Sequence, residues 1–575
     1  MNKPIRKVSI AIGVLLLALF VNLNVVQVVQ GNSYRDNSQN RRVLLNEYSN
    51  PRGQITVQGT AVAESRKTTD ELKYLREYPQ GPVYAPVTGF YSYIYGASGI
   101  EETDNDVLSG DSPSLFTTNL TSLLTGRNPR GGRVELTINR AAQAAAYKAM
   151  RLSNGTYRPG AVVALDPSNG AILAAVSTPS YDPGALSSHD SGDISHAYAC
   201  YSDIDTVRRV GESSTALKAR IAKQLAEREK TSKSKGCSNV PDDPTAFLKK
   251  DPTALGPFHN RAFDVTYPPG SIFKVVVSAA ALKAGVKPDD KIFAPQYYWP
   301  DDATATQKQT PCPKTDTGPC IHNFTLDNGV RETCNGSNKF ATLDFALEKS
   351  CNTAFAAVAN EKLGIGKIAA EAKLFGIDTT PPKIPLSTVG STVGSVSQLA
   401  RDPVALGQTA FGQRDVAITP LQAAMISSAV AQNGTLYKPH LVQKTYRPNQ
   451  SVLSDPQPSQ MSQVLDPGLN SELMQMMENV VTGKQAGDDA TGKSAAITDI
   501  PNVVVGGKTG TADHQDANGN ALPAHSWFSG FALVKGEAKI AVAVILEDSD
   551  ATGGEDAAPK ARQVMEAYLR SIGTD

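Results

Sequence analysis

An uncharged, mostly apolar stretch near the N-terminus limits what this chain can fold into more than any other feature. No charged residue occurs between Lys7 and Arg35, and Val8 to Val29 form a largely apolar run of 22 residues. About 20 apolar residues in a helix are enough to cross the hydrocarbon core of a bilayer. A cleaved signal peptide is the alternative, but polar residues stand where its small cleavage-site residues are expected: Asn22, Asn24, Gln27 and Gln30.

The basic residues on the two sides of this run nearly balance, so the orientation of the segment rests on other features. The N-terminal tail is short and basic, and the chain after the run is long, which favours a tail inside the cell and the bulk of the protein outside. We therefore expect residues 1–30 to form a cytoplasmic tail and a single membrane anchor, with the membrane span at about 8–29. The long part of the chain that follows the anchor is then extracytoplasmic.

The length and charge of the chain narrow the remaining possibilities. At 575 residues it is long enough for more than one domain. Its 56 Lys and Arg residues equal its 56 Asp and Glu residues, and this neutral balance removes the electrostatic argument for nucleic-acid binding. A hydrophobic content of 40% at this length allows a large buried core.

Six cysteines occur after the apolar run, at Cys200, Cys237, Cys312, Cys320, Cys334 and Cys351. They form no Cys-x-x-Cys pair and have no neighbouring His at zinc-site spacing. An even number of cysteines outside the membrane is compatible with disulfides. Nearest-neighbour pairing (200–237, 312–320 and 334–351) is the expectation, and free buried thiols are the alternative.

The pattern of elements predicts a small domain followed by a large one. Residues 31–132 are polar and irregular, with short strand-like runs at 42–45 and 54–57, and they suit a pedestal or dimerisation-like domain. Residues 133–575 start with a strand and an Ala-rich helix, followed by two buried strands at 161–165 and 171–176 joined by a turn. Three more strands and a closing helix follow near the C-terminus, at 503–505, 527–534, 540–546 and about 557–569.

Strands from both ends of the large region, with helices between them, imply one central sheet built from distant segments and covered by helices. The predicted fold class is therefore α/β (α+β), with a pedestal domain and one membrane helix. Two regions break the regular pattern. Residues 182–260 contain a charged helix at about 215–230, which suits a solvated insertion better than a partner-binding helix, and residues 294–337 suggest a disulfide-pinned loop.

A Ser-x-x-Lys pair opens an apolar run of helical length after Tyr267-Pro268-Pro269-Gly270. Since Pro-Pro-Gly disfavours a helix before it, Ser271 is predicted at a helix N-terminus, where free N–H groups and the helix dipole favour a developing oxyanion. Lys274 lies one turn further on and is predicted to reach the Ser271 hydroxyl as its base. To act near neutral pH, its pKa must fall by roughly three units from about 10.4, through burial and a neighbouring cation.

Two further motifs follow in order. Ser350-Cys351-Asn352 supplies Ser-x-Asn, and Lys508-Thr509-Gly510 supplies Lys-Thr-Gly at a predicted strand. With Ser-x-x-Lys, this order resembles the penicillin-recognising serine acyltransferases, although Cys351 stands where an Asp is usual. Flanking segments make the chain resemble class B penicillin-binding proteins, nearest to the actinobacterial penicillin-binding protein A group: 50–55, 267–274, 412–413, 419–422, 527–531, 553–554 and 557–559. The resemblance is weakest over 187–251.

The resemblance implies a catalytic role for five side chains. Ser271 would attack the D-Ala-D-Ala carbonyl of a stem peptide and carry the acyl group, with Lys274 as its base. Ser350 and Lys508 would relay a proton to the departing D-Ala. Asn352 would hold the substrate amide and Lys274.

Substrate binding is implied for the third motif and the residue that follows it. Lys508, Thr509 and Thr511 would hold the substrate carboxylate, with Gly510 between the two threonines. The backbone N–H groups of Ser271 and Thr511 would form the oxyanion hole. An amine of a neighbouring stem peptide would then replace water as the acceptor, and penicillins would acylate the same serine.

The resemblance implies no metal and no cofactor, and His514 and His525 beside the third motif are expected to be wall or surface residues. Implied partners are lipid II-derived glycan strands with their stem peptides, β-lactams and a polytopic membrane glycosyltransferase of the shape, elongation, division and sporulation (SEDS) family. The N-terminal region is too short for a glycosyltransferase domain of its own. The sequence does not distinguish roles in cell elongation, division or sporulation.

Two other functions remain open at this point. A hydrolase on the same fold, a β-lactamase or D,D-carboxypeptidase, is disfavoured because neither Asp nor Glu occurs between Asp378 and Asp402 to activate a deacylating water. A tyrosine in place of Ser350, the other well-known hydrolytic arrangement, is also absent. A non-catalytic β-lactam sensor or scaffold is disfavoured because every residue of the three motifs is present.

Overall fold

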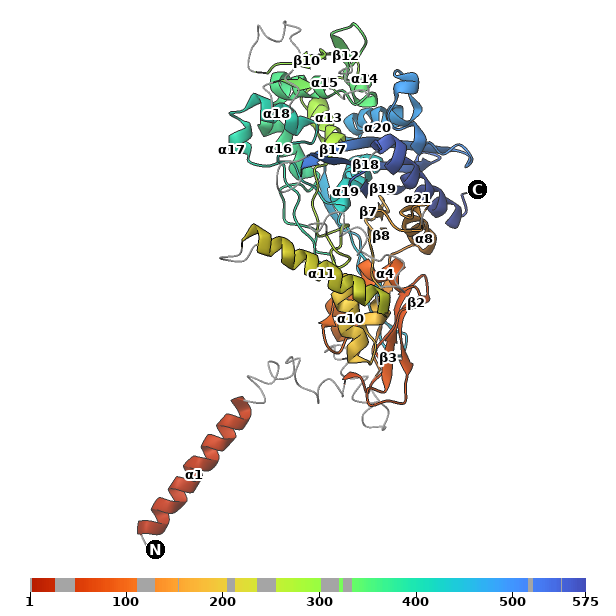
Figure 1. The fold of residues 1–575 in the computed structure, drawn as a ribbon. Helices are drawn as coiled ribbons and strands as arrows, with labels where there is room; N and C mark the ends of the chain where they lie inside the picture. Colours follow the sequence, from red (N-terminus) through yellow and green to blue (C-terminus); the bar gives the residue numbers. More distant parts are fainter. Residues whose placement is uncertain are drawn as a thin grey trace.

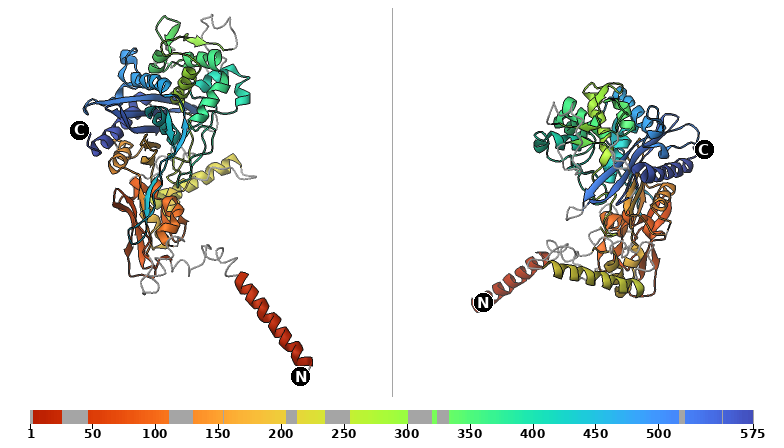
Figure 2. Two further views of the ribbon diagram at one scale, coloured as in Figure 1. Left: turned by 180° about the vertical axis from the view of Figure 1, so that it is seen from behind. Right: turned by 45° about the horizontal axis from the view of Figure 1, so that its top comes forward.

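The computed structural model describes residues 3–25, 47–110, 130–153, 155–203, 213–234, 255–300, 320–323, 333–515, 521–549 and 551–574. Figure 1 shows an upper body built around one antiparallel sheet and a lower body built around a second sheet. Figure 2 shows the same two bodies from behind and with the top turned forward, and the orange segments that follow α1 in the sequence lie in the lower body.

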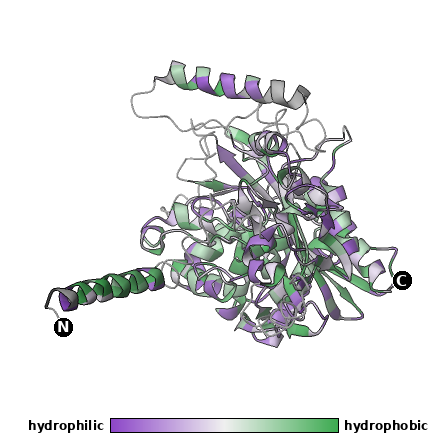
Figure 3. Ribbon diagram, turned by 90° about the horizontal axis from the view of Figure 1, so that it is seen from below, coloured by the Kyte–Doolittle hydropathy of each residue, from purple (hydrophilic) through white to green (hydrophobic). Residues whose placement is uncertain are grey.

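The N-terminal helix α1 (Lys3–Asn24) is long and apolar enough to cross a membrane. Its segment from Arg6 to Asn24 has a mean hydropathy of 1.9, and Figure 3 colours most of the helix as hydrophobic. It coincides with the predicted membrane span over residues 8–24. Residues 26–29 of that span lie outside the described residues.

The upper body contains the predicted central sheet, in the order β17-β18-β19-β7-β8 with every neighbouring pair antiparallel. The hairpin of β7 and β8 therefore lies beside strands that come more than 300 residues later, which confirms the predicted fold class. The strands run longer than their apolar cores suggest, and their bounds are β7 Gly160–Leu165, β8 Ile172–Thr178, β17 Val503–Gln515, β18 Ala521–Val534 and β19 Glu537–Leu546.

Helices cover both faces of this sheet. Helices α8 (Arg140–Ala149) and α21 (Ala558–Ser571) pack together on one face, and α19 (Pro420–Ala431) packs on the other. The N-cap of α8 is the predicted Asn139, whose side chain accepts hydrogen bonds from two backbone N–H groups at 3.0 Å.

Further helices and several small ladders complete the upper body. The helices are α13 (Lys274–Lys283), α14 (Leu343–Glu348), α15 (Asn352–Ala357), α16 (Gly364–Leu374), α17 (Val396–Leu399), α18 (Pro403–Ala410) and α20 (Pro467–Thr482). The ladders pair β9 (Lys291–Phe293) with β12 (Phe340–Thr342), β10 (Tyr297–Tyr298) with β11 (Ile321–His322), and β13 (Thr435–Tyr437) with β16 (Gln460–Gln463).

The lower body contains a six-stranded sheet in the order β15-β14-β6-β1-β2-β3. Its strands come from three parts of the chain: β1 (Ile55–Val57), β2 (Thr60–Lys67), β3 (Tyr74–Glu77), β6 (Arg133–Leu136), β14 (Val442–Tyr446) and β15 (Val452–Ser454). The predicted boundary at 132/133 falls just before β6, which pairs with β1 in parallel. The sheet of the lower body thus takes strands from both sides of the predicted boundary, and the domain limits stay a prediction.

Short helices α4 (Gly81–Thr88), α5 (Gly99–Thr103) and α6 (Asn105–Ser109) complete this lower body. A buried charge cluster joins them to the sheet. The Glu101 carboxylate accepts hydrogen bonds from Arg52 Nε at 2.5 Å, Arg76 Nε at 2.6 Å and the Tyr78 hydroxyl at 3.1 Å. All three charged side chains are at most 6% exposed. Arg52, one of the residues on which the family resemblance rests, therefore stabilises the lower body through a buried ion pair.

Replacing Glu101 with glutamine is expected to destabilise this lower body by roughly 3–5 kcal/mol, because the change leaves two buried guanidinium groups without a counter-charge. Chemical denaturation of the full chain in detergent measures the effect. The matched control is Glu77→Gln, which breaks an exposed pair with Arg66 and should cost less than about 1 kcal/mol. Equal losses in the two variants would contradict the prediction.

The described part of the predicted insertion between residues 182 and 260 is largely helical. It contains α9 (Pro183–Leu186), α10 (Ser191–Tyr201) and the predicted charged helix, α11 (Ser214–Ser234), which projects from the body in Figure 1. Most of the predicted loop at 294–337 and the strand-like run at 42–45 lie outside the described residues. Cys334 is bonded to Cys351 as predicted. Cys200 and Cys320 are also in disulfides, but Cys237 and Cys312 lie outside the described residues, so the other two pairings stay predictions.

Candidate active site

The segment before Ser271 is held by contacts with two other parts of the chain. Tyr267 exchanges backbone hydrogen bonds with Ile418, both at 2.9 Å. The indole N–H of Trp527 donates to the Pro268 carbonyl at 3.1 Å, so the central sheet fixes the same turn. Ser271 then lies in a 3₁₀ turn (Gly270–Phe273) that continues into α13. Its position in the first helical turn is the one predicted.

Two glycines allow the first and third motifs to touch. Gly270 has φ +52°, and a Cβ added to it would lie 2.7 Å from the Thr511 carbonyl oxygen. A Cβ on Gly510 would lie 2.7 Å from the Pro269 carbonyl oxygen. Any side chain at either glycine would push β17 away from the turn that carries Ser271. This contact places the backbone of Ser271 beside that of Thr511.

Lys274 is fully buried at the start of α13 and points to the second motif. Its Nζ donates to the Ser350 carbonyl at 2.6 Å, to the Ser350 hydroxyl at 3.2 Å and to Asn352 Oδ1 at 2.8 Å. None of its hydrogen bonds goes to Ser271 Oγ in the part of the chain that the structure describes. The contact between Lys274 and Ser271 therefore stays a prediction, and hydrogen bonds at catalytic groups often tighten only when substrate is bound.

Lys508 approaches the same hydroxyl from β17. Its Nζ, which is also fully buried, donates to Ser350 Oγ at 2.9 Å and to the Thr509 carbonyl at 3.1 Å. Ser350 Oγ is therefore hydrogen-bonded to two lysine Nζ atoms, one from α13 and one from β17. This arrangement joins all three motifs through one hydroxyl.

The pKa values of both lysines are lowered. Burial, and after it the charge of Lys508, hold the pKa of Lys274 well below its usual value. Burial lowers the pKa of Lys508 to about 7. A buried ammonium loses hydration, and a second cation nearby disfavours its charge further. The two causes expected from the sequence to lower the pKa of Lys274, burial and a neighbouring cation, are thus both present.

The second motif is locked by its own loop. Ser350 has φ +62°, a conformation that residues with a side chain rarely adopt. The disulfide from Cys351 to Cys334 follows directly, and Asn352 Nδ2 donates to the His322 carbonyl at 3.2 Å. The cysteine in the middle of the motif is therefore a structural partner of Cys334, as expected.

Replacing Cys334 and Cys351 together with alanine is expected to slow penicillin acylation by about tenfold or more, because the loop no longer holds Ser350 and Asn352 beside Lys274. Loss of the cross-link over 17 residues should also cost about 3 kcal/mol of stability. Quenched time courses of labelling with a fluorescent penicillin measure the acylation rate. A double variant that acylates at the wild-type rate would show that the loop geometry does not depend on the bond.

The remaining predicted binding residues line the same strand. Thr509 is 6% exposed, and Gly510 and Thr511 follow it in β17 next to the Ser271 turn. Cross-strand pairing places Lys508 opposite Ser529 and Gly510 opposite Trp527, so the Trp527 segment flagged by the resemblance forms the back of the site.

A buried ionic network lies behind the nucleophile and was not predicted from the sequence. The Glu547 carboxylate, at the end of β19, accepts hydrogen bonds from the Tyr267 hydroxyl at 2.5 Å and from Arg261 Nε at 2.7 Å. Arg261 is completely buried. No local pattern marks these residues, since an Arg or Glu near the end of a strand is usually solvated; only their burial after folding distinguishes them.

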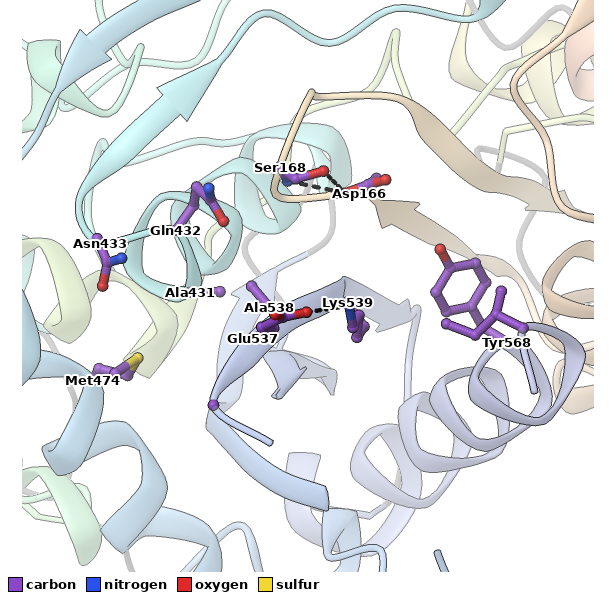
Figure 4. A pocket seen from close by; sticks show the side chains of 12 residues that line it. Asp166, Ser168, Ala431, Gln432, Asn433, Met474, Glu537, Ala538, Lys539 and Tyr568 are labelled. Carbon is purple, nitrogen blue, oxygen red and sulfur yellow. Dashed lines mark hydrogen bonds and ion pairs between the residues drawn. The ribbon is translucent and has the colours of Figure 1, made fainter. Parts of the chain in front are cut away.

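One cavity among the described residues lies away from the three motifs. It has a volume of about 490 Å³ and sits where the β18–β19 turn meets the ends of α19 and α21. Figure 4 shows that its charged groups pair with their neighbours, Asp166 with Ser168 and Glu537 with Lys539. It contains no residue of the three motifs, so we place the candidate active site at the motifs and not in this cavity.

Comparisons with known proteins agree with this assignment. A model of the penicillin binding protein transpeptidase domain matches residues 160–319 and 316–566, and a model of the penicillin binding protein A dimerisation domain matches residues 52–134. The peptidoglycan D,D-transpeptidase PbpA of Mycolicibacterium smegmatis is 37% identical over 576 residues, covering 99% of both chains. The protein of the same name from Mycobacterium tuberculosis is 35% identical over 579 residues, again covering 99% of both.

A solved structure is similar over nearly the whole chain. The ceftriaxone acyl-enzyme complex of penicillin-binding protein A from M. tuberculosis matches with a TM-score of 0.73 at 34% identity. The match covers 92% of this chain and 100% of that chain.

Proposed function

Because this chain belongs to the class B penicillin-binding proteins, the transpeptidase family of its mycobacterial relatives, we propose that it is a peptidoglycan D,D-transpeptidase acting through an acyl-enzyme on Ser271. It cross-links stem peptides of the cell wall, and β-lactams inhibit it by acylating the same hydroxyl. The proposal rests above all on the pair of buried lysines, Lys274 and Lys508, that share hydrogen bonds to Ser350 Oγ at 3.2 and 2.9 Å.

Acylation needs a base for the Ser271 hydroxyl. Lys274 is the proposed base, because burial and the charge of Lys508 lower its pKa and so favour the neutral amine, the form that can accept a proton. It takes the proton as Ser271 Oγ bonds to the carbonyl carbon of the penultimate D-Ala. The negative charge that develops on the carbonyl oxygen faces the backbone N–H groups of Ser271 and Thr511.

Departure of the terminal D-Ala needs a proton on its nitrogen. Ser350 Oγ lies between the two lysines and is the proposed relay from them to that nitrogen as the C–N bond breaks. Lys508, in its charged form, attracts the substrate carboxylate together with Thr509 and Thr511. Asn352 keeps Lys274 in place through the 2.8 Å bond to its Oδ1.

The second half-reaction repeats these steps in reverse. An amine of a neighbouring stem peptide attacks the ester carbonyl, gives up a proton to the base and releases Ser271. The cross-link then carries the acyl group as a new amide. The absence of an acidic residue from 379–401 fits an acceptor other than an activated water.

We further propose that α1 anchors the protein as a single-pass membrane protein with both bodies outside the membrane. Its length and hydropathy support this placement. Substrate then arrives as nascent glycan strands on lipid carriers, which a polytopic SEDS-family glycosyltransferase supplies.

The test is a cross-linking assay with the full chain in detergent and lipid II polymerised by a separate glycosyltransferase. The proposal predicts dimeric stem peptides in the digested product, and none after preincubation with benzylpenicillin. Penicillin acylation without dimers would favour a sensor or scaffold. Sustained turnover of nitrocefin, or release of D-Ala without dimers, would favour a hydrolase.

A further inference from the structure

Two histidines and an aspartate meet beside the active-site strand. His514 lies near the end of β17, His525 lies on β18, and Asp548 follows the end of β19. His514 and His525 stack with ring centroids 3.8 Å apart, and His514 Nε2 lies 2.8 Å from Asp548 Oδ1. Two strands of the central sheet and the turn that follows a third thus contribute one side chain each to a single cluster.

The donor atoms of this cluster are close enough to share one ion. One ligand atom from each of the three residues can be chosen so that all lie within 4.8 Å of one another. In a tetrahedral zinc site with bonds of about 2.0–2.1 Å, ligand atoms lie about 3.3 Å apart, so shifts on the order of 1 Å suffice. Among the described residues, no other group of three His, Cys, Asp or Glu side chains meets this condition.

One imidazole of the cluster has a ring nitrogen without a hydrogen-bond partner in the protein. His514 Nδ1 is buried and has no hydrogen-bond partner. His525 Nδ1 receives only a long 3.3 Å hydrogen bond, from the backbone N–H of Asp548. Buried polar atoms without partners are uncommon and call for an explanation, such as a bound ion.

We propose that His514, His525 and Asp548 form a binding site for a divalent transition metal, with Zn²⁺ as the ion best suited to it. Two imidazoles and one carboxylate are a known zinc ligand set, and it leaves a fourth position for water. The site lies outside the proposed transpeptidase chemistry and does not depend on it.

Binding requires one ring to turn, because imidazole lone pairs lie in the ring planes, and the lone pairs of two nearly parallel stacked rings do not converge on one ion. The ring planes are 27° apart. His525 is 9% exposed and packs edge-on against Tyr267 at 5.4 Å, whereas the His514 side chain is 18% exposed. His514 is therefore the ring that turns toward the ion.

The bound ion would connect the β17–β18 hairpin to the end of β19. His514 comes three residues after Thr511 on the substrate-binding strand, and His525 contacts Tyr267 behind the nucleophile. The ion would thus stabilise the strand that carries Lys508 and Thr511. Zinc is expected to raise the unfolding temperature, because it binds the folded state only.

The test titrates full-length protein in detergent, stripped of metal, with Zn²⁺ by calorimetry, and with Co²⁺ by visible absorption. We expect one ion per chain and a d–d spectrum typical of four or five ligands with imidazole nitrogen. His514→Ala and Asp548→Asn alter partly exposed side chains, and each should weaken binding by more than about 100-fold, beyond the loss usual for an outer-shell change.

The matched control is His259→Ala, which removes a His–Asp pair with a 2.7 Å contact to Asp203 but no second histidine. This variant should keep the zinc affinity of the wild type. Labelling of Ser271 by a fluorescent penicillin verifies that each variant is folded. Wild-type protein that binds zinc no better than His514→Ala, or zinc binding that survives both ligand substitutions, would overturn the proposal.

Discussion

Replacing Ser271 with alanine is expected to abolish covalent penicillin binding and to reduce cross-linking by a factor on the order of 10⁴ or more. The variant lacks the oxygen that forms the acyl bond, and Lys274 and Lys508 are left without a nucleophile to activate. Because Ser271 is only half-buried at the start of a helix, alanine should leave the fold intact. Mass spectrometry of protein treated with benzylpenicillin detects the acyl adduct directly.

A second serine on the same helix supplies the control. Ser278 is fully buried in α13, and its hydroxyl has no hydrogen-bond partner. Ser278→Ala should therefore acylate at the wild-type rate, with little change or a small gain in stability, since no hydrogen bond is lost. A penicillin adduct that persists at full yield in Ser271→Ala, on any other residue, would refute the assigned nucleophile.

Replacing Lys508 with methionine is expected to lower the acylation rate by about 10²–10³-fold and to change the shape of its pH dependence. The second-order rate constant of acylation reports ionisations of the free enzyme. In the wild type it should rise as Lys274 loses its proton, and fall above a pH of about 7 as Lys508 loses the charge that attracts the substrate carboxylate. In Lys508→Met the rate constant should no longer fall at alkaline pH, so the alkaline limb of the pH profile should be absent.

The acid limb should move as well. The charge of Lys508 is one of the two causes that lower the pKa of Lys274, the other and larger being burial. Methionine keeps the burial and removes the charge, so the pKa of Lys274 should rise and the acid limb should shift to higher pH. Stopped-flow acylation by benzylpenicillin across the pH range measures both limbs. An acid limb that stays in place, or an alkaline limb that remains, would contradict these assignments.

The same variant should be more stable than the wild type near neutral pH. A lysine whose pKa is lowered by folding binds fewer protons in the folded state than in the unfolded state, so its presence costs free energy below its unfolded pKa. For Lys508 this cost falls as the pH rises from about 7 toward 10.5. Since one pKa unit corresponds to about 1.4 kcal/mol, Lys508→Met should gain a few kcal/mol at pH 7, less the hydrogen bonds it loses. The gain should shrink at alkaline pH.

Local patterns were sufficient for most elements of the large body. The strands at 161–165 and 171–176 and the helix starting after Asn139 follow from short runs of apolar residues and turn or cap residues next to them. Strand lengths were underestimated, because β17 continues through Lys508, Thr509 and Thr511. Their polar and glycine-rich sequence has low strand propensity, and cross-strand pairing with β18 decides their conformation.

The lower body was the hardest to predict. The pairing of β1 with β6, and of β6 with β14, joins residues up to several hundred positions apart. Nothing in the local composition of β14 shows whether it belongs to the sheet of the lower body or to the central sheet of the upper body. The Arg52–Glu101–Arg76 cluster could not be predicted for the same reason, because its members are far apart in the sequence. Each of them resembles an ordinary surface charge until folding buries it.

For the candidate site, the sequence by itself determined which side chains are present and in what order, because Ser271, Ser350 and Lys508 belong to short motifs with distinctive neighbours. It also determined the apolar helix at the N-terminus, whose length and hydropathy are local properties. Only the tertiary structure decided that Lys274 and Lys508 share one hydroxyl, that both lose their water, and that His514, His525 and Asp548 meet. Proximity between distant segments and the loss of hydration arise only when the chain packs, and they control the pKa values on which the chemistry depends.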